Sequence, residues 1–268
     1  MSRYLINLIL SLSLGGVLLL GGGGSLDYLQ KLKSLNLAPK NSQLGKLENL
    51  KIHSLLFRKY PIIRDNKEIG YLLLDDKGRL AEFNLPSLEK FVRIKDFPRF
   101  SFFLNSHATA AAILLAQLGL GGKEPEKVFI ASLNVFIEKC LCNLPGKPLI
   151  YDIGKGLRDF AKYKGKDLEV REIYKLKSGE NPLDFYKREI SGGRATIVSF
   201  IYDREGREPD RAKERREADS YIGVGYLSLP LEKKENKFFL LLYDGKSLLA
   251  KSYEGSYANL IILGARLK

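Results

Sequence analysis

The chain has 268 residues, of which 45% are hydrophobic and 28% charged, and its formal net charge is +13. This composition excludes a disordered chain and allows one or two globular domains with a sizeable core. The basic excess is spread along the chain, which favours loose attraction to anionic surfaces over a dedicated groove, so no specific nucleic-acid partner is predicted.

Residues 1–24 combine a basic start at Arg3, an apolar run over 4–20 and four consecutive glycines. A charged region, an apolar region and a small-residue exit are typical of a signal peptide. The run is slightly short of the roughly 20 residues of a spanning helix. A cleaved signal peptide, an uncleaved membrane anchor and a buried N-terminal helix all remain open. We expect an exported protein, either extracellular or anchored at the cell envelope.

Residues 25–98 are predicted to form a small α+β accessory region. Scattered leucines indicate short helices around residues 26–35 and 44–56. Two apolar runs, 68–74 and 79–85, flank an Asp- and Gly-containing turn and predict a β-hairpin. Pro86 and Pro98 mark the boundary to the next region.

The following stretch is predicted to be mainly helical. Residues 106–118 are nearly continuously apolar and rich in alanine, which indicates a buried helix that ends at Gly119. Apolar residues at helical spacing predict an amphipathic helix over 124–142 and another from residue 153 to Gly165. A strand at 168–174 and a short helix at 183–190 follow.

The last part of the chain changes to a β-type pattern. Apolar runs at 195–202, 221–229, 238–243 and 259–267 leave no room for crossover helices, so we expect a largely antiparallel sheet. Helices followed by strands predict the α+β class.

Three short motifs occur in a recognisable order. The stretch Asn105-Ser106-His107-Ala108-Thr109 opens a helix, Ser220 precedes Tyr-Ile-Gly-Val-Gly-Tyr, and Asp244 ends an apolar strand. This order resembles the papain-like cysteine peptidases of the bacteriocin-processing type, which have Cys-Gly-Pro-Thr at a helix start, His before Val-Val-Gly-Tyr, and Asp at the end of the next strand. The resemblance covers residues 99–268 and implies a papain-like domain, with residues 25–98 as a prosegment-like region.

The resemblance puts Ser106 at the nucleophile position, Ser220 at the base position and Asp244 at the orienting position. A serine hydroxyl has a pKa far above neutrality and needs a strong base nearby. Neither Ser220 nor its neighbour Asp219 can replace an imidazole near neutral pH. The glutamine that such peptidases use for the oxyanion would fall near Phe100, and none is present.

The residues next to these positions are candidates for binding. Asn105 or Ser106 fits a helix N-cap. His107 fits either a polar residue of the first helical turn or a contact to a ligand in the cleft. Asp219 ends a mixed-charge insertion, 204–219, that enters the strand at the base position and fits either a solvated loop or a partner contact. Asp244 also fits a simple Asp-Gly turn.

Three functions follow as alternatives. The first is an exported or membrane-tethered pseudopeptidase that binds a peptide, a protein or an envelope component. The second is an active hydrolase or acyltransferase with Ser106 as nucleophile, and the third is a structural module of the bacterial envelope surface. No cofactor or metal site is expected, because the two histidines are far apart and the cysteines form a single Cys-X-Cys. Cys140 is expected to be a small core residue.

Overall fold

The computed structural model describes residues 23–53, 55–95, 97–100, 104–121, 124–142, 150–175, 179–202, 218–231, 236–255 and 259–268. Within them the chain is an α+β protein, as predicted. The helices are α2 (Gly23–Ser34), the 3-10 helix η1 (Pro86–Phe91), α3 (Ser106–Gln117), α4 (Glu126–Lys139), α5 (Ile153–Tyr163) and α6 (Pro182–Ser191). The strands are β1 (Gln43–Leu44), β2 (Glu48–Ile52), β3 (Leu55–Arg64), β4 (Lys67–Leu74), β5 (Leu80–Asn84), β6 (Leu141–Cys142), β7 (Ile150–Tyr151), β8 (Leu168–Tyr174), β9 (Thr196–Ile201), β10 (Ala218–Leu229), β11 (Lys237–Tyr243), β12 (Leu248–Ser252) and β13 (Asn259–Leu267).

An 11-stranded sheet organises the molecule. Its order is β1-β3-β4-β5-β12-β11-β10-β9-β13-β8, and β2 pairs with β3 at one side. Every pairing in the described part is antiparallel, which confirms the expected sheet type. The strands of residues 25–98 join the rest of the sheet where β5 pairs with β12, through Phe83↔Ala250 and Glu82↔Lys251. One sheet therefore runs through both predicted regions.

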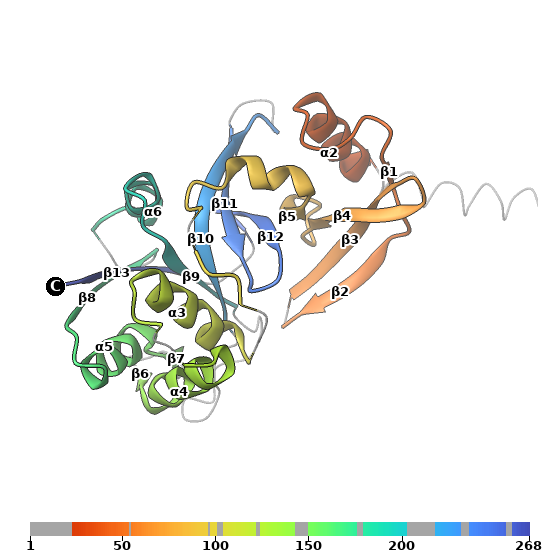
Figure 1. Ribbon diagram of the computed structural model, residues 1–268. Helices are drawn as coiled ribbons and strands as arrows, with labels where there is room; N and C mark the ends of the chain where they lie inside the picture. The colour runs from red at the N-terminus through yellow and green to blue at the C-terminus, as the bar shows by residue number, and fades with distance from the viewer. Residues whose placement is uncertain are drawn as a thin grey trace, which may run out of the picture.

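Helices cover both faces of the C-terminal half of this sheet. Helix α3 packs on β10 and β9, with α4 and α5 beside it, whereas α6 lies on the other side of the strands (Figure 1). The α6 residue Tyr186 fits against Gly223 of β10, where an added Cβ would come within 2.4 Å of the tyrosine ring. The Tyr186 hydroxyl donates a hydrogen bond to the Gly225 carbonyl at 2.7 Å. A glycine in the strand thus lets the helix approach the sheet closely.

Most predicted elements agree with the structure, but one predicted helix is wrong and several short elements, the strand β12 among them, were missed. The leucines of 44–56 suggested a helix, yet this stretch forms β2 and the start of β3, because the two segments pair along Glu48↔Lys59 to Ile52↔Leu55. Strand β12 was not predicted at all. It is only five residues long and contains Lys251, so its local pattern is weak, and its pairing with β11 and β5 creates it.

Two predicted features fall outside the described residues. They are most of the N-terminal segment 1–24 and most of the mixed-charge insertion 204–219. Among the helices that the structure describes, none combines the length and apolar character needed to cross a bilayer.

Candidate functional site

The site begins at the N-terminus of α3. Asn105 is the N-cap, and its side-chain oxygen accepts a hydrogen bond from the amide of Ala108 at 2.7 Å. Its side-chain nitrogen donates to Asn134 Oδ1 of α4 at 2.8 Å. The cap therefore satisfies an amide that the helix leaves unpaired and also fixes the start of α3 against α4. This arrangement positions the next two residues, Ser106 and His107, over the sheet.

Four polar side chains meet where α3 abuts β9 and β10, and we call them the Ser–His cluster: Ser106, His107, Ser199 and Ser220. The Ser220 amide donates to Ser106 Oγ at 3.3 Å. The Ser220 hydroxyl lies 2.7 Å from His107 Nδ1 and 2.7 Å from Ser199 Oγ. The structure thus brings together the nucleophile and base positions implied by the resemblance, and it adds His107 to them.

Burial controls the chemistry of this cluster. Ser220 is only 2% exposed. Burial lowers the pKa of His107, and the negative charge of Asp219 opposes this effect in part. The imidazole is therefore neutral at neutral pH, and one of its ring nitrogens is able to accept a proton. The cluster pairs a neutral base with a hydroxyl, but the hydroxyl is enclosed and already engaged with two partners.

Asp219 does not face this cluster. Successive residues of a strand point to opposite faces of the sheet, so Asp219 lies on the side away from Ser220. There its Oδ2 is 3.0 Å from Nε2 of His53, at the end of β2. The His53 ring also packs on Tyr202, with ring centroids 4.7 Å apart. The accessory strands therefore contact β10 at the residue next to the base position.

This contact continues as a chain of polar groups along the other sheet face, which we call the polar seam: His53, Asp219, Tyr202, Lys251, Glu82 and Tyr71. Lys251 Nζ donates to the Tyr202 hydroxyl at 2.8 Å and lies 3.4 Å from Glu82 Oε2. The Tyr71 hydroxyl donates to Glu82 Oε1 at 2.6 Å. The side chains of Lys251 and Glu82 are 11% and 8% exposed, so the seam is a buried ionic network.

The electrostatics of the seam favour charged Lys251. Burial acts to lower the pKa of Lys251, but the oxygens of Tyr202 and Tyr221 and the Glu82 carboxylate outweigh burial and raise it well above the usual lysine value. Burial and the Glu82 carboxylate raise the pKa of Tyr71. A protonated lysine is not a nucleophile, so this network is suited to holding strands together rather than to covalent chemistry.

Asp244 has a local role in the structure. Its Oδ1 accepts hydrogen bonds from the amides of Lys246 and Ser247, both at 2.7 Å. Gly245 in this turn has a φ of +99°, a conformation that suits glycine. The carboxylate thus closes the turn between β11 and β12, and no hydrogen bond joins it to Ser106 or Ser220 among the described contacts.

Sequence reasoning did not identify Ser199, His53 or Lys251 as members of a site. One feature of the sequence could have indicated Ser199. It is a polar residue in the middle of a strand whose other central residues are apolar and buried. Its register partner in β10 is Ser220. His53 and Lys251 lie far along the chain from their partners, and no local pattern indicates those contacts.

Comparisons with known proteins do not assign this site. No protein family model matches the chain, and no curated protein matches it significantly. Across the part of the chain that the structure describes, no group of three or more His, Cys, Asp or Glu side chains is arranged to hold a metal ion.

Proposed function

We propose that this chain is a catalytically inactive peptidase-like protein, exported or membrane-tethered, that acts by binding a peptide or protein ligand. The observation that carries the proposal is the Ser–His cluster. The two positions that the resemblance assigns to a cysteine and a histidine are held by Ser106 and Ser220, whose polar groups bond to each other and to neighbours inside the protein.

The state of the Cys140 thiol also supports loss of cysteine chemistry. Cys140, at the C-terminal end of α4, is buried, and its Sγ lies 3.6 Å from Asp159 Oδ2. Burial raises the pKa of the Cys140 thiol, whereas a reactive cysteine needs a lowered pKa and access to solvent. Asp244, at the orienting position, is engaged in its own turn.

One observation favours a second candidate, a serine hydrolase. The 2.7 Å separation between His107 Nδ1 and Ser220 Oγ is within the range for a general base and a nucleophile. The nucleophile in this version is Ser220 rather than Ser106. Its burial and its second hydrogen bond to Ser199 weigh against it, because a substrate carbonyl must reach the oxygen.

A single experiment separates the two candidates. The purified protein is incubated at neutral pH with a diverse peptide library, and mass spectrometry reads both cleavage products and peptides retained by the protein after gel filtration. We expect a set of peptides to be retained intact and none to be cut. A fluorophosphonate probe, which labels activated serines, should leave Ser106 and Ser220 unmodified.

Serine-to-alanine variants show whether any cleavage depends on the Ser–His cluster. Cleavage that disappears in Ser106→Ala or Ser220→Ala, but persists in the control Ser228→Ala, would establish a hydrolase and overturn the proposal. Ser228 is a suitable control because it is exposed and lies on the same strand, β10. Absence of both cleavage and retained peptides would also count against a peptide-binding role.

A further inference from the structure

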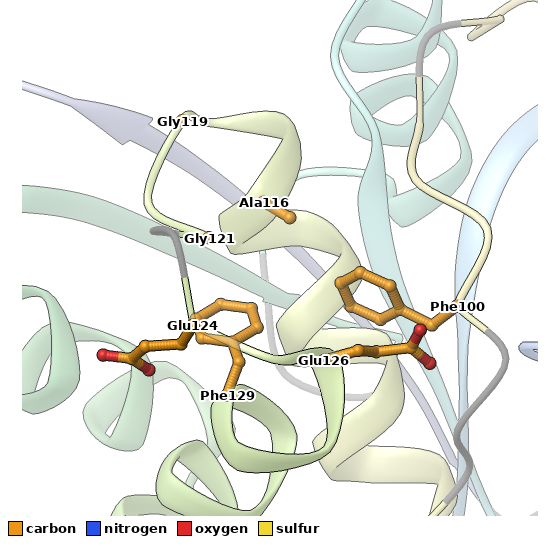
Figure 2. Close-up of a pocket in the computed structure, with 7 residues that line it drawn as sticks. All are labelled: Phe100, Ala116, Gly119, Gly121, Glu124, Glu126 and Phe129. Atoms are coloured by element: carbon orange, nitrogen blue, oxygen red, sulfur yellow. The ribbon is translucent and has the colours of Figure 1, made fainter.

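Helix α4 has apolar side chains on two opposite faces. Its inner face buries Phe129, Ile130, Leu133 and Ile137 where the helix packs on α3 and α5. Figure 2 shows the ring of Phe129 directed from α4 toward the C-terminal end of α3. A helix at the surface of a globular protein normally carries polar and charged residues on the face opposite its buried one. The outer face of α4 does not follow that rule.

Three small apolar residues form the middle of the outer face, and we call them the valine stripe: Val128, Ala131 and Val135. Their spacing of three and four residues places them on one line along the helix. All three are exposed, and the two valines keep 50% and 47% of their surface in contact with solvent. A contiguous apolar line indicates a contact surface, whereas single exposed apolar side chains do not.

The neighbouring helix α5 shows the ordinary surface pattern. It buries Leu157 and Phe160, whereas its outer face carries the exposed Lys155, Arg158 and Lys162. Helices α4 and α5 pack against each other in the same layer (Figure 1). The position of α4 in the fold therefore does not account for its apolar outer face, whereas a partner that covers this face would.

Two further exposed apolar side chains border the valine stripe. Tyr163 of α5 is 69% exposed, and its ring packs on Phe136 of α4 with centroids 5.5 Å apart. Leu104 is 43% exposed and precedes Asn105, which bonds to Asn134 of α4. Because residues 134 and 136 lie on opposite sides of residue 135 around a helix, these contacts widen the apolar surface on both sides of the stripe.

The valine stripe is chemically self-complementary. Two copies of α4 that meet antiparallel, with the two Ala131 residues at the centre, would place Val128 of each copy against Val135 of the other. A two-fold axis generates this kind of contact, in which the same surface serves both subunits. Alanine at the centre is small, so the helix axes could approach to the about 8–10 Å of ordinary helix packing.

Charges beside the stripe favour the same arrangement. Lys127 and Glu138 are exposed and lie near opposite ends of the stripe. About three helical turns separate them, so they lie on the same side, and an antiparallel copy brings each opposite a charge of the other sign. Lys127 also has a contact within its own chain, so these charges favour an orientation rather than a high affinity. The mixed signs do not suit an anionic membrane, which attracts basic surfaces.

We propose that the valine stripe is the contact surface of a two-fold symmetric dimer and that a second copy of this chain covers it. The surface is small, so the dimer exchanges with the monomer, with a Kd on the order of 10 μM. The inference goes beyond the proposed function, because the stripe is separate from the Ser–His cluster of α3, β9 and β10. Two joined copies would bind more strongly to a ligand with repeated elements.

Sedimentation equilibrium of the full chain tests the dimer. Measurements from about 1 to about 300 μM should show a reversible shift from the monomer mass to the dimer mass. Val128→Asp and Val135→Asp each put a charge into the contact and should weaken dimerisation about tenfold or more. Leu56→Asp is the matched control, because Leu56 is 64% exposed but lies on β3, and it should leave the association unchanged.

A charge exchange tests the antiparallel orientation. Glu138→Lys sets a like charge opposite Lys127 of the other copy and should weaken the dimer about threefold. Adding Lys127→Glu in the same chain should restore the association of the wild type. Glu169→Lys, at an exposed site on β8, makes the same charge change away from the stripe and should have no effect.

A cross-link locates the contact without charge changes. Ala131→Cys places a thiol near the two-fold axis and should give a disulfide-linked dimer after mild oxidation. Lys162→Cys, on the outer face of α5, should not. The wild-type chain, which has Cys140 and Cys142, gives the background.

A monomer at every concentration would overturn the inference. Association that both aspartate variants leave unchanged would also overturn it, because such association runs through another part of the chain. Failure of the charge exchange to restore the dimer would exclude the antiparallel pairing. Peptides retained intact by a monomeric chain would still support the proposed function, so the two proposals fail separately.

Discussion

His107 lies in helix α3 and contacts strand β10. It belongs to the first turn of α3, as predicted, but its side chain reaches across to Ser220 on β10. Burial lowers its pKa below the ordinary value of 6.5. The unfolded chain therefore takes up a proton at a higher pH than the folded chain does. The stability associated with neutral His107 is complete above about pH 6.5 and is lost as the pH falls through the folded pKa.

We predict that stability falls as the pH drops below about 6.5 and that His107→Gln reduces this fall, because it removes the group that titrates. The measurement is urea unfolding followed by circular dichroism at several pH values, with the comparison made as a difference between the two proteins. His53→Gln serves as the control for the other histidine. Parallel stability curves for the wild type and His107→Gln would contradict the prediction.

The pairing of strands β5 and β12 depends on a buried ion pair. Lys251 of β12 and Glu82 of β5 are register partners, and both side chains are almost enclosed. Removing one member leaves the other charge buried without its counter-ion, which typically costs about 3–5 kcal/mol. Removing both charges together avoids that penalty. The pair therefore fixes the register at the joint between the two parts of the sheet.

We expect Lys251→Met to destabilise the fold by about 3–5 kcal/mol, and Glu82→Gln in the same chain to recover part of that loss. Glutamine is chosen because it keeps an acceptor for the Tyr71 hydroxyl. A double-mutant cycle of denaturant unfolding gives the coupling energy. Simple additivity of the two single changes would show that the pair is not coupled.

Lys59 serves as the control for Lys251, because its ion-pair partners are much more exposed. Its ion pairs with Glu48 and Glu68, at 3.4 and 3.5 Å, involve carboxylates that are about half exposed. Because solvent screens such pairs, Lys59→Met should cost no more than about 1 kcal/mol. A cost as large as that of Lys251→Met would mean that burial is not the deciding factor.

One main core connects the N-terminal and C-terminal parts of the described chain. The main hydrophobic cluster of the described residues extends from Leu29 and Ile62 in the N-terminal region to Phe239 and Ala265 near the C-terminus. Phe83 of β5 packs edge to face on Phe239 of β11, with centroids 5.3 Å apart. Strand β5 also covers the edge of β12, and an uncovered edge strand promotes aggregation.

A chain that begins at residue 99 should therefore not fold to a native state, although the sequence suggests a domain boundary there. This shorter chain lacks β5, so the edge of β12 and the ring of Phe239 would be uncovered. Lys251 would also lose its partner Glu82. Far-UV circular dichroism and gel filtration would reveal an unfolded or aggregated product. A monomer with cooperative unfolding would show instead that residues 99–268 are an independent domain.

The sequence predicted local elements best where its pattern was strong. The strands Leu168–Tyr174 and Asn259–Leu267 match their predicted bounds, and α3 begins at the predicted Asn-Ser pair because capping is a local interaction. The helix predicted over 44–56 was wrong, because pairing with β3 overrides the leucine spacing. The proximity of Ser106 and Ser220 was implied by the order of motifs, whereas the bond between His107 and Ser220 was not.

By itself, the sequence therefore determined the α+β class, most of the helices and strands, and the absence of a cysteine–histidine pair at the positions of the resemblance, since residue types and short-range patterns suffice for these. Only the tertiary structure decided that His107, Ser199 and Ser220 share one cluster and that Asp219 turns away to His53. The physical reason is that strand register and helix packing set these contacts. Both depend on residues far apart in the chain.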